Sequence, residues 1–492
     1  MIITSPVFLF LFFPLFLLFY YVLPAKIKNA FLLLSSLIFY AWGEKRLVLL
    51  LIISAICNYI IGRFIERFNK KTWLVLSLIF NLTILFYFKY LHFTFDNIRS
   101  LLSIAGINPG NFLPSLSIIV PLGISFLTFR AISYSLDVYK AKVPASHNLI
   151  SFLTYFTMFP PIIAGPIVRY SEISVQLDSR RISLEDVSAG IERFTVGLFK
   201  KVIIANTFGL VADQVFLIPV AQLPAYWAWI GLITFFFQIY YDFSGYSDMA
   251  IGLARMIGFR FNENFNYPYI AKDIRDFWRR WHISLTTWLR DYIFLPLAFS
   301  LSKRWKKDRI ACFRTDRLIH IIAVMITFIA CGFWHGPTWG YIFWGIFYGF
   351  FIVIESAGFG KILKKAWKPL QHIYTLLIVI IGWVFFKNEH LSDAFRYLGK
   401  MFSFSRGDST ISSYLSFYYL TKEFLFVSLI ALFFITPLYP KISRAINSGW
   451  PDKKIINKTI QLGSILTLLF LLLISVAYIA AGTHNPFIYS KF

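Results

Sequence analysis

Long apolar runs, separated by short polar segments, follow one another along almost the whole chain. They fall near 6–23, 30–42, 47–62, 73–91, 116–136, 149–168, 194–218, 226–257, 283–301, 318–334, 338–356, 370–386, 424–440 and 460–481. A helix needs about 20 apolar residues to cross the ~30 Å hydrocarbon core of a bilayer. Some runs are too short to span alone, and others suit re-entrant or interfacial helices. The pattern predicts an all-α polytopic membrane protein with roughly 11–13 spanning helices.

Polar residues divide this single integral-membrane domain, 1–492, into three parts. Residues 1–149 form a plain series of hydrophobic helices, and 360–492 form further helices. Between about 150 and 350, Gly, Pro, Asp, Arg, His and Trp lie inside or beside the apolar runs. Broken helices and polar groups at membrane depth occur only where protein lines a cavity. We therefore expect the functional site in the region 150–350.

The first apolar run lacks the basic segment and the small-residue cleavage site of a secretory signal peptide. It is also too long for the apolar part of such a signal. Lys26 and Lys28 follow it, and positive residues beside a membrane helix favour the cytoplasmic side. We therefore expect a retained first transmembrane helix whose N-terminus lies outside.

Composition and charge agree with a membrane protein. The chain is 58% hydrophobic and 15% charged, whereas ordinary globular proteins carry about 25% charged residues. The net charge of +24 would suggest nucleic acid as the partner of a soluble protein. Here Lys and Arg lie mostly between apolar runs, where they face the cytoplasm and anionic membrane lipids. Composition thus excludes a soluble fold, and the loop pattern argues against a nucleic-acid partner.

One apolar run in the middle of the chain carries two aspartates, Asp242 and Asp248. A charged side chain at the bilayer centre costs about 2.5–3.5 kcal/mol on insertion scales, so its presence needs a reason. One interpretation is structural: Gly245 breaks the helix, and the aspartates cap it or pair with Arg255 or Arg275. The other is that this segment lines a cavity and orients a catalytic base or a polar substrate.

The segment 271–297 predicts one amphipathic helix that dips from the cytoplasmic interface into the membrane. Its apolar stripe has helical spacing and runs through Trp278, His282, Leu285, Leu289 and Tyr292. Arg279 and Arg280, in its arginine-rich first half, suit the phosphates of a lipid or of a nucleotide-bearing donor such as coenzyme A. His282 is either a hydrogen-bonded core histidine or a member of the functional site.

A further histidine, His335, lies within another long apolar stretch. Gly336 and Pro337 follow it and predict a break into two helices. Trp334 and Trp339 could supply flat aromatic walls. Burial in a low dielectric favours a neutral imidazole, which is the state that a general base needs. We interpret His335 as a candidate general base, with a structural histidine as the alternative.

Other chemistries lack their motifs in this chain. There is no G-x-S-x-G elbow, no Walker A loop and no H-E-x-x-H helix. Cys57, Cys312 and Cys331 form no C-x-x-C pair, and no acidic cluster completes a ligand set. We expect no metal site and no bound cofactor.

Three segments resemble the membrane-bound O-acyltransferase (MBOAT) family: YYDFSGYSDMAIGLARMIGF (240–259), DFWRRWHISLTTWLRDYIFLPL (276–297) and GFWHGPTWGYIFWGIFYG (332–349). FPPIIAGPIVRY (159–170) and NPFIY near the C-terminus are similar to its bacterial branch of alginate O-acetyltransferase membrane subunits. The resemblance covers essentially the whole chain, and the two histidine motifs are its most specific part. It implies the MBOAT fold, with helices around a central tunnel open to both membrane faces.

The resemblance also implies site residues. His335 and His282 match the two active-site histidines of the family, and Asp242, Asp248 and Arg290 would support the tunnel. As to chemistry, we expect His335 to remove the proton of an acceptor hydroxyl. His282 would orient the donor or help to stabilise the oxyanion.

The implied activity is O-acyl transfer, most simply of acetyl, across the membrane. The donor would be cytosolic acetyl-CoA, with its phosphates at the arginine-rich cytoplasmic mouth, and the acceptor would be an exported polysaccharide such as alginate. The implied partners are a periplasmic or membrane-anchored SGNH-type acetyltransferase and a polysaccharide synthase complex. The implied location is the bacterial cytoplasmic (inner) membrane.

Two stretches depart from the usual pattern of that branch. Residues 298–309 read AFSLSKRWKKDR where a Gly-Gly-Asn stretch is common, and the chain ends in SKF (490–492) instead of a Phe-Gln-Phe-type end. These departures concern the identity of the polymer. The alternatives are D-alanyl transfer to teichoic acid from a carrier protein, a transporter that uses the same polar path, or a scaffold for a synthase complex. The absence of inverted repeats argues against the transporter.

Overall fold

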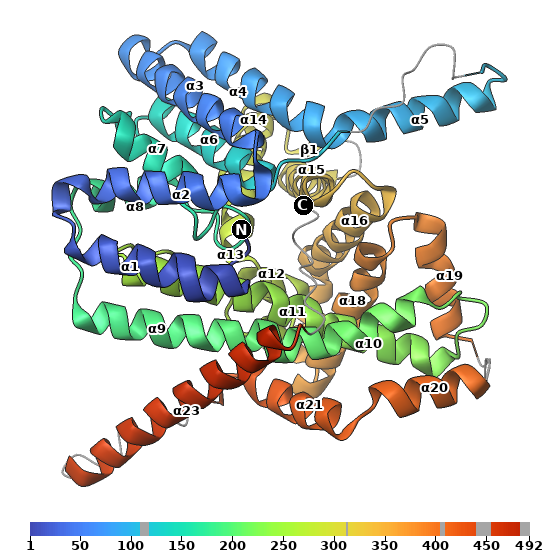
Figure 1. The fold of residues 1–492 in the computed structure, drawn as a ribbon. Helices are drawn as coiled ribbons and strands as arrows, with labels where there is room; N and C mark the ends of the chain where they lie inside the picture. Colours follow the sequence, from blue (N-terminus) through green and yellow to red (C-terminus); the bar gives the residue numbers. More distant parts are fainter. Residues whose placement is uncertain (109–117, 311–312, 404–408, 439–453, 483–492) are drawn as a thin grey trace.

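The structure is a computed structural model that describes residues 1–108, 118–310, 313–403, 409–438 and 454–482. Nearly all regular structure in these residues is helical, as Figure 1 shows. The exception is a short antiparallel pair, β1 (Arg309–Ile310) with β2 (Phe313–Arg314). The all-α prediction is confirmed. The NPFIY motif and the C-terminal SKF lie outside the described residues.

Seven helices of the described residues are long and apolar enough to cross a membrane, and a pair bent by 69° would make an eighth span. The prediction of roughly 11–13 spans was higher than this. The difference arises because several apolar runs form helices that are too short to span alone, such as the apolar helix Phe8–Val22. The chain is nevertheless a multi-pass membrane protein, as predicted.

The N-terminal helices gather in one half of the molecule (Figure 1), with α5 extending away from the others. They are η1 (Phe8–Phe12), α1 (Phe13–Val22), η2 (Ala25–Ile27), α2 (Lys28–Glu44), α3 (Leu47–Phe68), α4 (Lys71–Leu85), η3 (Phe86–Tyr90), α5 (Leu91–Ile104), α6 (Ile124–Tyr139) and α7 (Leu149–Thr157). The segment η3 is a π-helix that continues α4 into α5. Such π-helical turns occur frequently at functional sites.

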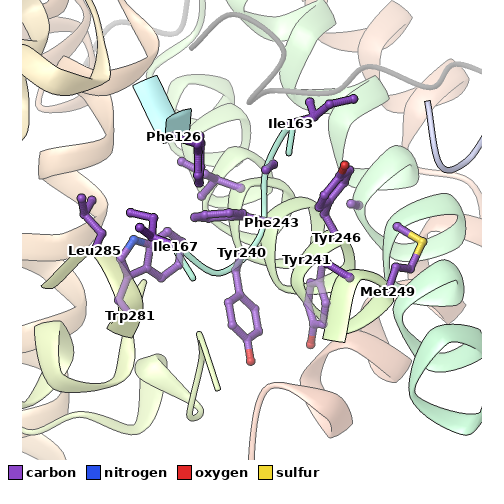
Figure 2. Packing of buried hydrophobic residues seen from close by; sticks show 14 of the residues in the cluster. Phe126, Ile163, Ile167, Tyr240, Tyr241, Phe243, Tyr246, Met249, Trp281 and Leu285 are labelled. Carbon is purple, nitrogen blue, oxygen red and sulfur yellow. The ribbon is translucent and has the colours of Figure 1, made fainter. Parts of the chain in front are cut away.

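The central helices cross the middle of the molecule and carry the predicted motifs. They are α8 (Tyr170–Asp178), α9 (Leu184–Phe199), η5 (Lys200–Ala205), α10 (Asn206–Leu217), α11 (Ala225–Met256), η6 (Pro268–Ile270), α12 (Ile274–Arg280), α13 (Ile283–Leu289), η7 (Arg290–Phe294), α14 (Leu295–Arg304), α15 (Thr315–His335) and α16 (Trp339–Ile354). Figure 2 shows buried side chains of α11, among them Tyr240 and Phe243, packed with Phe126 of α6 and Leu285 of α13. The predicted functional region is therefore the core of the fold.

The C-terminal helices cover the other side of this core. They are η8 (Glu355–Phe359), α17 (Gly360–Lys365), α18 (Lys368–Lys387), α19 (Leu391–Met401), α20 (Ser409–Tyr419), α21 (Lys422–Phe434) and α23 (Lys454–Ala480). The long helix α23, red in Figure 1, projects away from the body. Only 6% of its apolar window is buried, so a bilayer would cover most of its surface.

The helix α11 is continuous through Gly245, so the expectation of a helix break at this residue is wrong. Gly245 instead allows a close approach of α9 and η5. A Cβ atom at Gly245 would lie 2.7 Å from the carbonyl oxygen of Gly197, and one at Gly197 would lie 2.6 Å from that of Gly245. Small residues allow membrane helices to pack backbone to backbone in this way.

Candidate active site

His335 is the last residue of α15, and only 2% of its surface is exposed. The helix ends there because Gly336 is extended (φ 179°, ψ 163°) and Pro337 has no N–H to continue the hydrogen-bond ladder. The next helix, α16, begins at Trp339 after its N-cap Thr338. The predicted break of the apolar stretch into two helices is confirmed.

Aromatic rings enclose the imidazole of His335. The ring centroids of Trp334, Trp344 and Phe386 lie 4.8, 5.0 and 5.2 Å from that of His335. Trp344 belongs to α16 and Phe386 to α18, so three helices build the surroundings of one histidine. The imidazole therefore faces a protein-lined interior and not lipid.

His282 interrupts the segment that was predicted to be one helix from 271 to 297. It adopts left-handed backbone angles (φ 43°, ψ 54°) between α12 and α13. Residues other than glycine rarely adopt this conformation, and such strained positions cluster at functional sites. The single-helix prediction is wrong because apolar periodicity does not register one left-handed residue. The turn directs the buried imidazole toward Phe243, with 4.6 Å between the ring centroids.

Trp334 connects the two histidines. Its ring centroid lies 6.1 Å from that of His282 and 4.8 Å from that of His335. The two histidines are also close enough to interact electrostatically. The indole Nε1 of Trp334 is buried and has no hydrogen-bond partner among the described residues. An indole N–H can only donate a hydrogen bond. The site therefore contains two imidazoles and, in the N–H of Trp334, one donor that binds no other described group.

The amide of Asn264 sets the tautomer of His282. Its Oδ1 accepts hydrogen bonds from the backbone N–H of Ser284 at 3.2 Å and from Ser284 Oγ at 2.8 Å. A backbone N–H only donates, so the amide atom that faces it is the oxygen. The same oxygen lies 3.1 Å from Nδ1 of His282, which must therefore carry the proton. The buried Nε2, which has no hydrogen-bond partner in the described residues, is left with a lone pair.

The other side-chain atom of the Asn264 amide and its backbone carbonyl are hydrogen-bonded as well. Nδ2 donates to Oγ of Ser247 in α11 at 3.0 Å, and the backbone carbonyl accepts the N–H of Ile283 at 2.9 Å. The sequence interpretation missed this residue. The available signal was a polar Asn-Glu-Asn-Phe-Asn stretch (262–266) shortly before the histidine motif.

Two residues of the N-terminal third also reach this site and were not predicted. Lys89 donates to the backbone carbonyl of Trp334 at 2.7 Å, and Tyr90 donates to that of Phe333 at 2.8 Å. The signal in the sequence was a lysine inside an apolar run, FYFKYLHF (86–93). The functional site is therefore not confined to the region 150–350.

The two aspartates of α11 form buried ion pairs with the helix beside it. Asp242 pairs with Lys201 (Nζ to Oδ1, 2.5 Å), and both side chains are almost fully buried. Asp248 pairs with Arg193 at 2.6 Å and with Lys200 at 2.7 Å. These carboxylates thus bind cations of α9 and η5. On the same helix, Phe243 contacts His282 and Ser247 accepts a hydrogen bond from Asn264.

The partners expected for these aspartates are bound elsewhere. Arg255 pairs with Asp186, and Arg275 lies 3.7 Å from the carboxylate of Glu355. The expectation that Arg255 or Arg275 would neutralise Asp242 or Asp248 is therefore wrong. Sequence proximity suggested Arg255, but the close contact of α9 with α11 brings other cations nearer.

Two other predicted side chains lie apart from the histidines. Trp339 is 55% exposed, and its Nε1 donates to Oδ1 of Asn97 in α5 at 3.0 Å. Arg290 is exposed, and its Nε binds Asp291 at 2.8 Å. Partial burial raises the pKa of Asp291. The hydrogen bonds from Arg290 and Arg169 lower it by more, so that the pKa of Asp291 lies below its usual value. Neither Trp339 nor Arg290 lines the histidine site.

The arginines predicted to bind the donor lie at the end of α12, just before His282. Arg279 is exposed. Arg280 is held by Asp276 (3.0 Å) and donates to the backbone carbonyl of Asn266 at 3.2 Å. Among the described residues Arg279 makes no ion pair, while Arg280 is partly engaged within the protein. Within the residues that the structure describes, no group of three His, Cys, Asp or Glu side chains is placed to hold a metal ion.

Fold and site together define a multi-pass helical membrane protein with two buried histidines at breaks in its helices. The chain belongs to the membrane-bound O-acyltransferase family, whose model matches residues 37–386. Both histidine motifs lie inside this match. The predicted family resemblance is confirmed, and with it O-acyl transfer as the class of activity.

Several curated relatives are similar over most of their length. The probable alginate O-acetylase AlgI of Azotobacter vinelandii is 41% identical over 84% of this chain and 80% of that protein. The protein of the same name from Pseudomonas putida is 38% identical over 100% of both chains. A peptidoglycan O-acetyltransferase of Helicobacter pylori is 33% identical over 81% of this chain and 79% of that protein.

Proposed function

We propose that this chain moves an acetyl group from cytosolic acetyl-CoA across the membrane for the O-acetylation of an exported polysaccharide such as alginate. The observation that carries the proposal is the placement of two buried imidazoles on either side of Trp334. Proton-accepting groups inside a membrane are costly and mark functional sites. A transfer that begins on one membrane face and ends on the other needs such a site in the protein interior.

In the proposed reaction, the acceptor hydroxyl oxygen attacks the carbonyl carbon of the thioester. His335 takes the hydroxyl proton as the new C–O bond forms. The tetrahedral intermediate then collapses, the C–S bond breaks, and the proton returns to the departing thiolate of coenzyme A. The products are the acetyl ester and free coenzyme A, so no oxidant, reductant or metal is needed.

The position of the proton on His282 limits the roles that this residue can have in the reaction. Nδ1 is committed to Asn264, and Nε2 carries a lone pair, so the neutral ring has no N–H to offer an oxyanion. We therefore replace the expected oxyanion role of His282 with that of a hydrogen-bond acceptor that orients a substrate. The uncommitted N–H of Trp334 is suited to stabilise the oxyanion instead.

The charge near His282 supports coenzyme A as the carrier of the acetyl group. Arg279 is exposed at the end of α12 and separated from His282 by only two residues. A guanidinium binds phosphate well, and the phosphates of coenzyme A would remain at this position while its thin pantetheine arm reaches the histidines. Arg280 would contribute charge from its place between Asp276 and Asn266.

The names of the relatives support the acceptor class. Proteins that match this chain over most of its length are named for the O-acetylation of alginate or of peptidoglycan. We propose that the acetyl group passes to a periplasmic or membrane-anchored SGNH-type acetyltransferase beside a polysaccharide synthase complex. The proposed location is the bacterial cytoplasmic membrane.

The test uses the purified full-length chain in proteoliposomes with acetyl-CoA and with D-alanyl carrier protein. Wild type should release free coenzyme A, slowly without acceptor and faster with an acceptor polysaccharide, whereas His335→Ala should release almost none. His92→Ala is the matched control, because His92 is exposed on α5 and binds Asp96. Acetyl transfer by His335→Ala at the wild-type rate, use of D-alanyl carrier protein alone, or no thioester cleavage by wild type would each overturn the proposal.

A further inference from the structure

Lys89 is a buried lysine that has no carboxylate partner among the described residues. Only 4% of its surface is exposed, although it lies inside an apolar run that is long enough to span a membrane. Its Nζ donates to the carbonyl of Trp334 at 2.7 Å and to Oγ of Ser125 at 3.0 Å. Among the described residues no carboxylate forms an ion pair with it. Ionisable residues in such positions are costly and are retained for function.

The contacts of Lys89 lie where α15 loses its own hydrogen bonds. In a continuous helix, the carbonyl of Phe333 would accept from residue 337 and that of Trp334 from residue 338. Pro337 has no N–H, and the extended Gly336 carries the chain out of the helix. Both carbonyls are thus among the unsatisfied groups of a helix C-terminus, which cost free energy when they are buried.

Two adjacent residues of the π-helix η3 satisfy these carbonyls from outside the helix. Lys89 binds Trp334, and the hydroxyl of Tyr90 donates to Phe333 at 2.8 Å. The ring of Tyr90 also stacks on that of Phe333, with centroids 4.1 Å apart. The bond from Lys89 spans 245 residues of sequence. The end of α15 is therefore held by a helix from the N-terminal third.

We propose that Lys89 is a positioning residue for His335, held there to fix the peptide that joins Trp334 to His335. This inference rests on the proposed role of His335 in the transfer. Nζ of Lys89 binds the carbonyl of Trp334 at 2.7 Å and also lies 5.8 Å from the ring centroid of Trp334. The side chain of Lys89 thus restrains both the backbone and the indole ring beside the imidazole of His335.

The geometry explains why this position requires precision. His335 is the last helical residue, followed directly by an extended glycine. Without an external partner, the last turn of a helix frays, and a displacement of about 1 Å at a reacting group costs about 100-fold in rate. Substrate binding at Arg279, in α12, does not depend on this restraint. Loss of Lys89 should therefore lower kcat and leave KM for the donor almost unchanged.

The test compares Lys89→Met, which has a similar length but no donor, with Lys89→Gln, which keeps a neutral donor. Tyr87→Phe is the control, because Tyr87 belongs to the same π-helix but is 51% exposed. We expect kcat to fall about 10–100-fold in Lys89→Met, with KM for the donor within about twofold of wild type and partial recovery of kcat in Lys89→Gln. The melting temperature should fall in Lys89→Met, because the carbonyl of Trp334 loses its donor, but the kcat of the protein that remains folded should fall as well. Tyr87→Phe should behave as wild type.

The inference is overturned if Lys89→Met transfers acetyl with wild-type kcat, or if only KM or the melting temperature changes. If Lys89→Met does not accumulate in the membrane, the kcat of Lys89→Gln is compared with that of Tyr87→Phe instead. Equal values overturn the inference, and a lower value in Lys89→Gln supports it. Failure of the proposed function is distinct from these outcomes, since wild type itself would then cleave no thioester.

Discussion

Oδ1 of Asn264 lies 3.1 Å from Nδ1 of His282 and fixes this imidazole with its proton on Nδ1. The assignment rests on the backbone N–H of Ser284, which identifies the amide oxygen. A histidine that binds its neighbour through one nitrogen leaves the other nitrogen for the substrate, in a defined protonation state. The loop before α12 thus contributes to the chemistry without contacting the reacting atoms.

Asn264→Ala should lower acetyl transfer by about 10–100-fold, because the imidazole loses its tautomer and its orientation. It should also lower the free energy of unfolding by about 1–3 kcal/mol, since Ser284 and His282 lose a buried acceptor. Initial rates of coenzyme A release and thermal unfolding in detergent measure the two effects. Ser247→Ala is the control, because it removes only the partner of Nδ2. An equal loss of activity in Ser247→Ala would contradict the tautomer argument.

Trp334→Phe removes the uncommitted indole N–H and keeps an aromatic ring, which can remain stacked on Phe129. If this N–H stabilises the oxyanion, kcat should fall about 100–1,000-fold while KM changes little. Steady-state kinetics with acetyl-CoA give both constants. Trp339→Phe is the matched control, because Trp339 is exposed and binds Asn97. A kcat within about twofold of wild type in Trp334→Phe would rule out the donor role.

Asp242→Asn should destabilise the protein by about 3–5 kcal/mol, because Lys201 would then be buried without its counter-charge. The double variant Lys201→Met, Asp242→Leu should recover much of that loss, since an apolar pair of similar volume avoids the cost of desolvation. Membrane abundance and melting temperature are the measurements. An Asp242→Asn variant that is fully stable but inactive would instead indicate a direct role of this carboxylate in the reaction.

Gly197→Ala should force α9 and α11 apart. The added Cβ would lie 2.6 Å from the carbonyl oxygen of Gly245 and 2.7 Å from the backbone nitrogen of Met249. Overpacking of this kind typically costs about 1–3 kcal/mol. Gly399→Ala in α19 is the control, because no atom lies within 4 Å of the added Cβ. Replacing glycine in a helix should there stabilise the protein by about 0.4–1 kcal/mol. Thermal unfolding of both variants checks the contrast, and equal stability would contradict the close contact.

Local sequence was sufficient for the class of protein and for the position of one histidine. Apolar runs long enough to cross a bilayer require a helical membrane protein, because every backbone group must find its partner within the segment. Gly336 and Pro337 act on the chain directly and end the helix at His335 wherever the neighbouring helices lie. The apolar stripe of 271–297 also singled out His282 as a candidate, and the family motifs favoured a place in the active site, although periodicity placed it wrongly inside a continuous helix.

The partners of these residues could not be derived from local patterns. Lys89 binds the carbonyl of Trp334, which is 245 positions away in the sequence. Asp242 forms an ion pair with Lys201 because two glycines, Gly197 and Gly245, let the helices approach each other. Hydrophobic periodicity describes which face of a helix is apolar, but it contains no information on which other helix covers that face. In a membrane most helix faces are equally apolar, so small residues and buried polar bonds select the neighbours. The surroundings of His282 and His335 therefore follow from the packing of the whole chain.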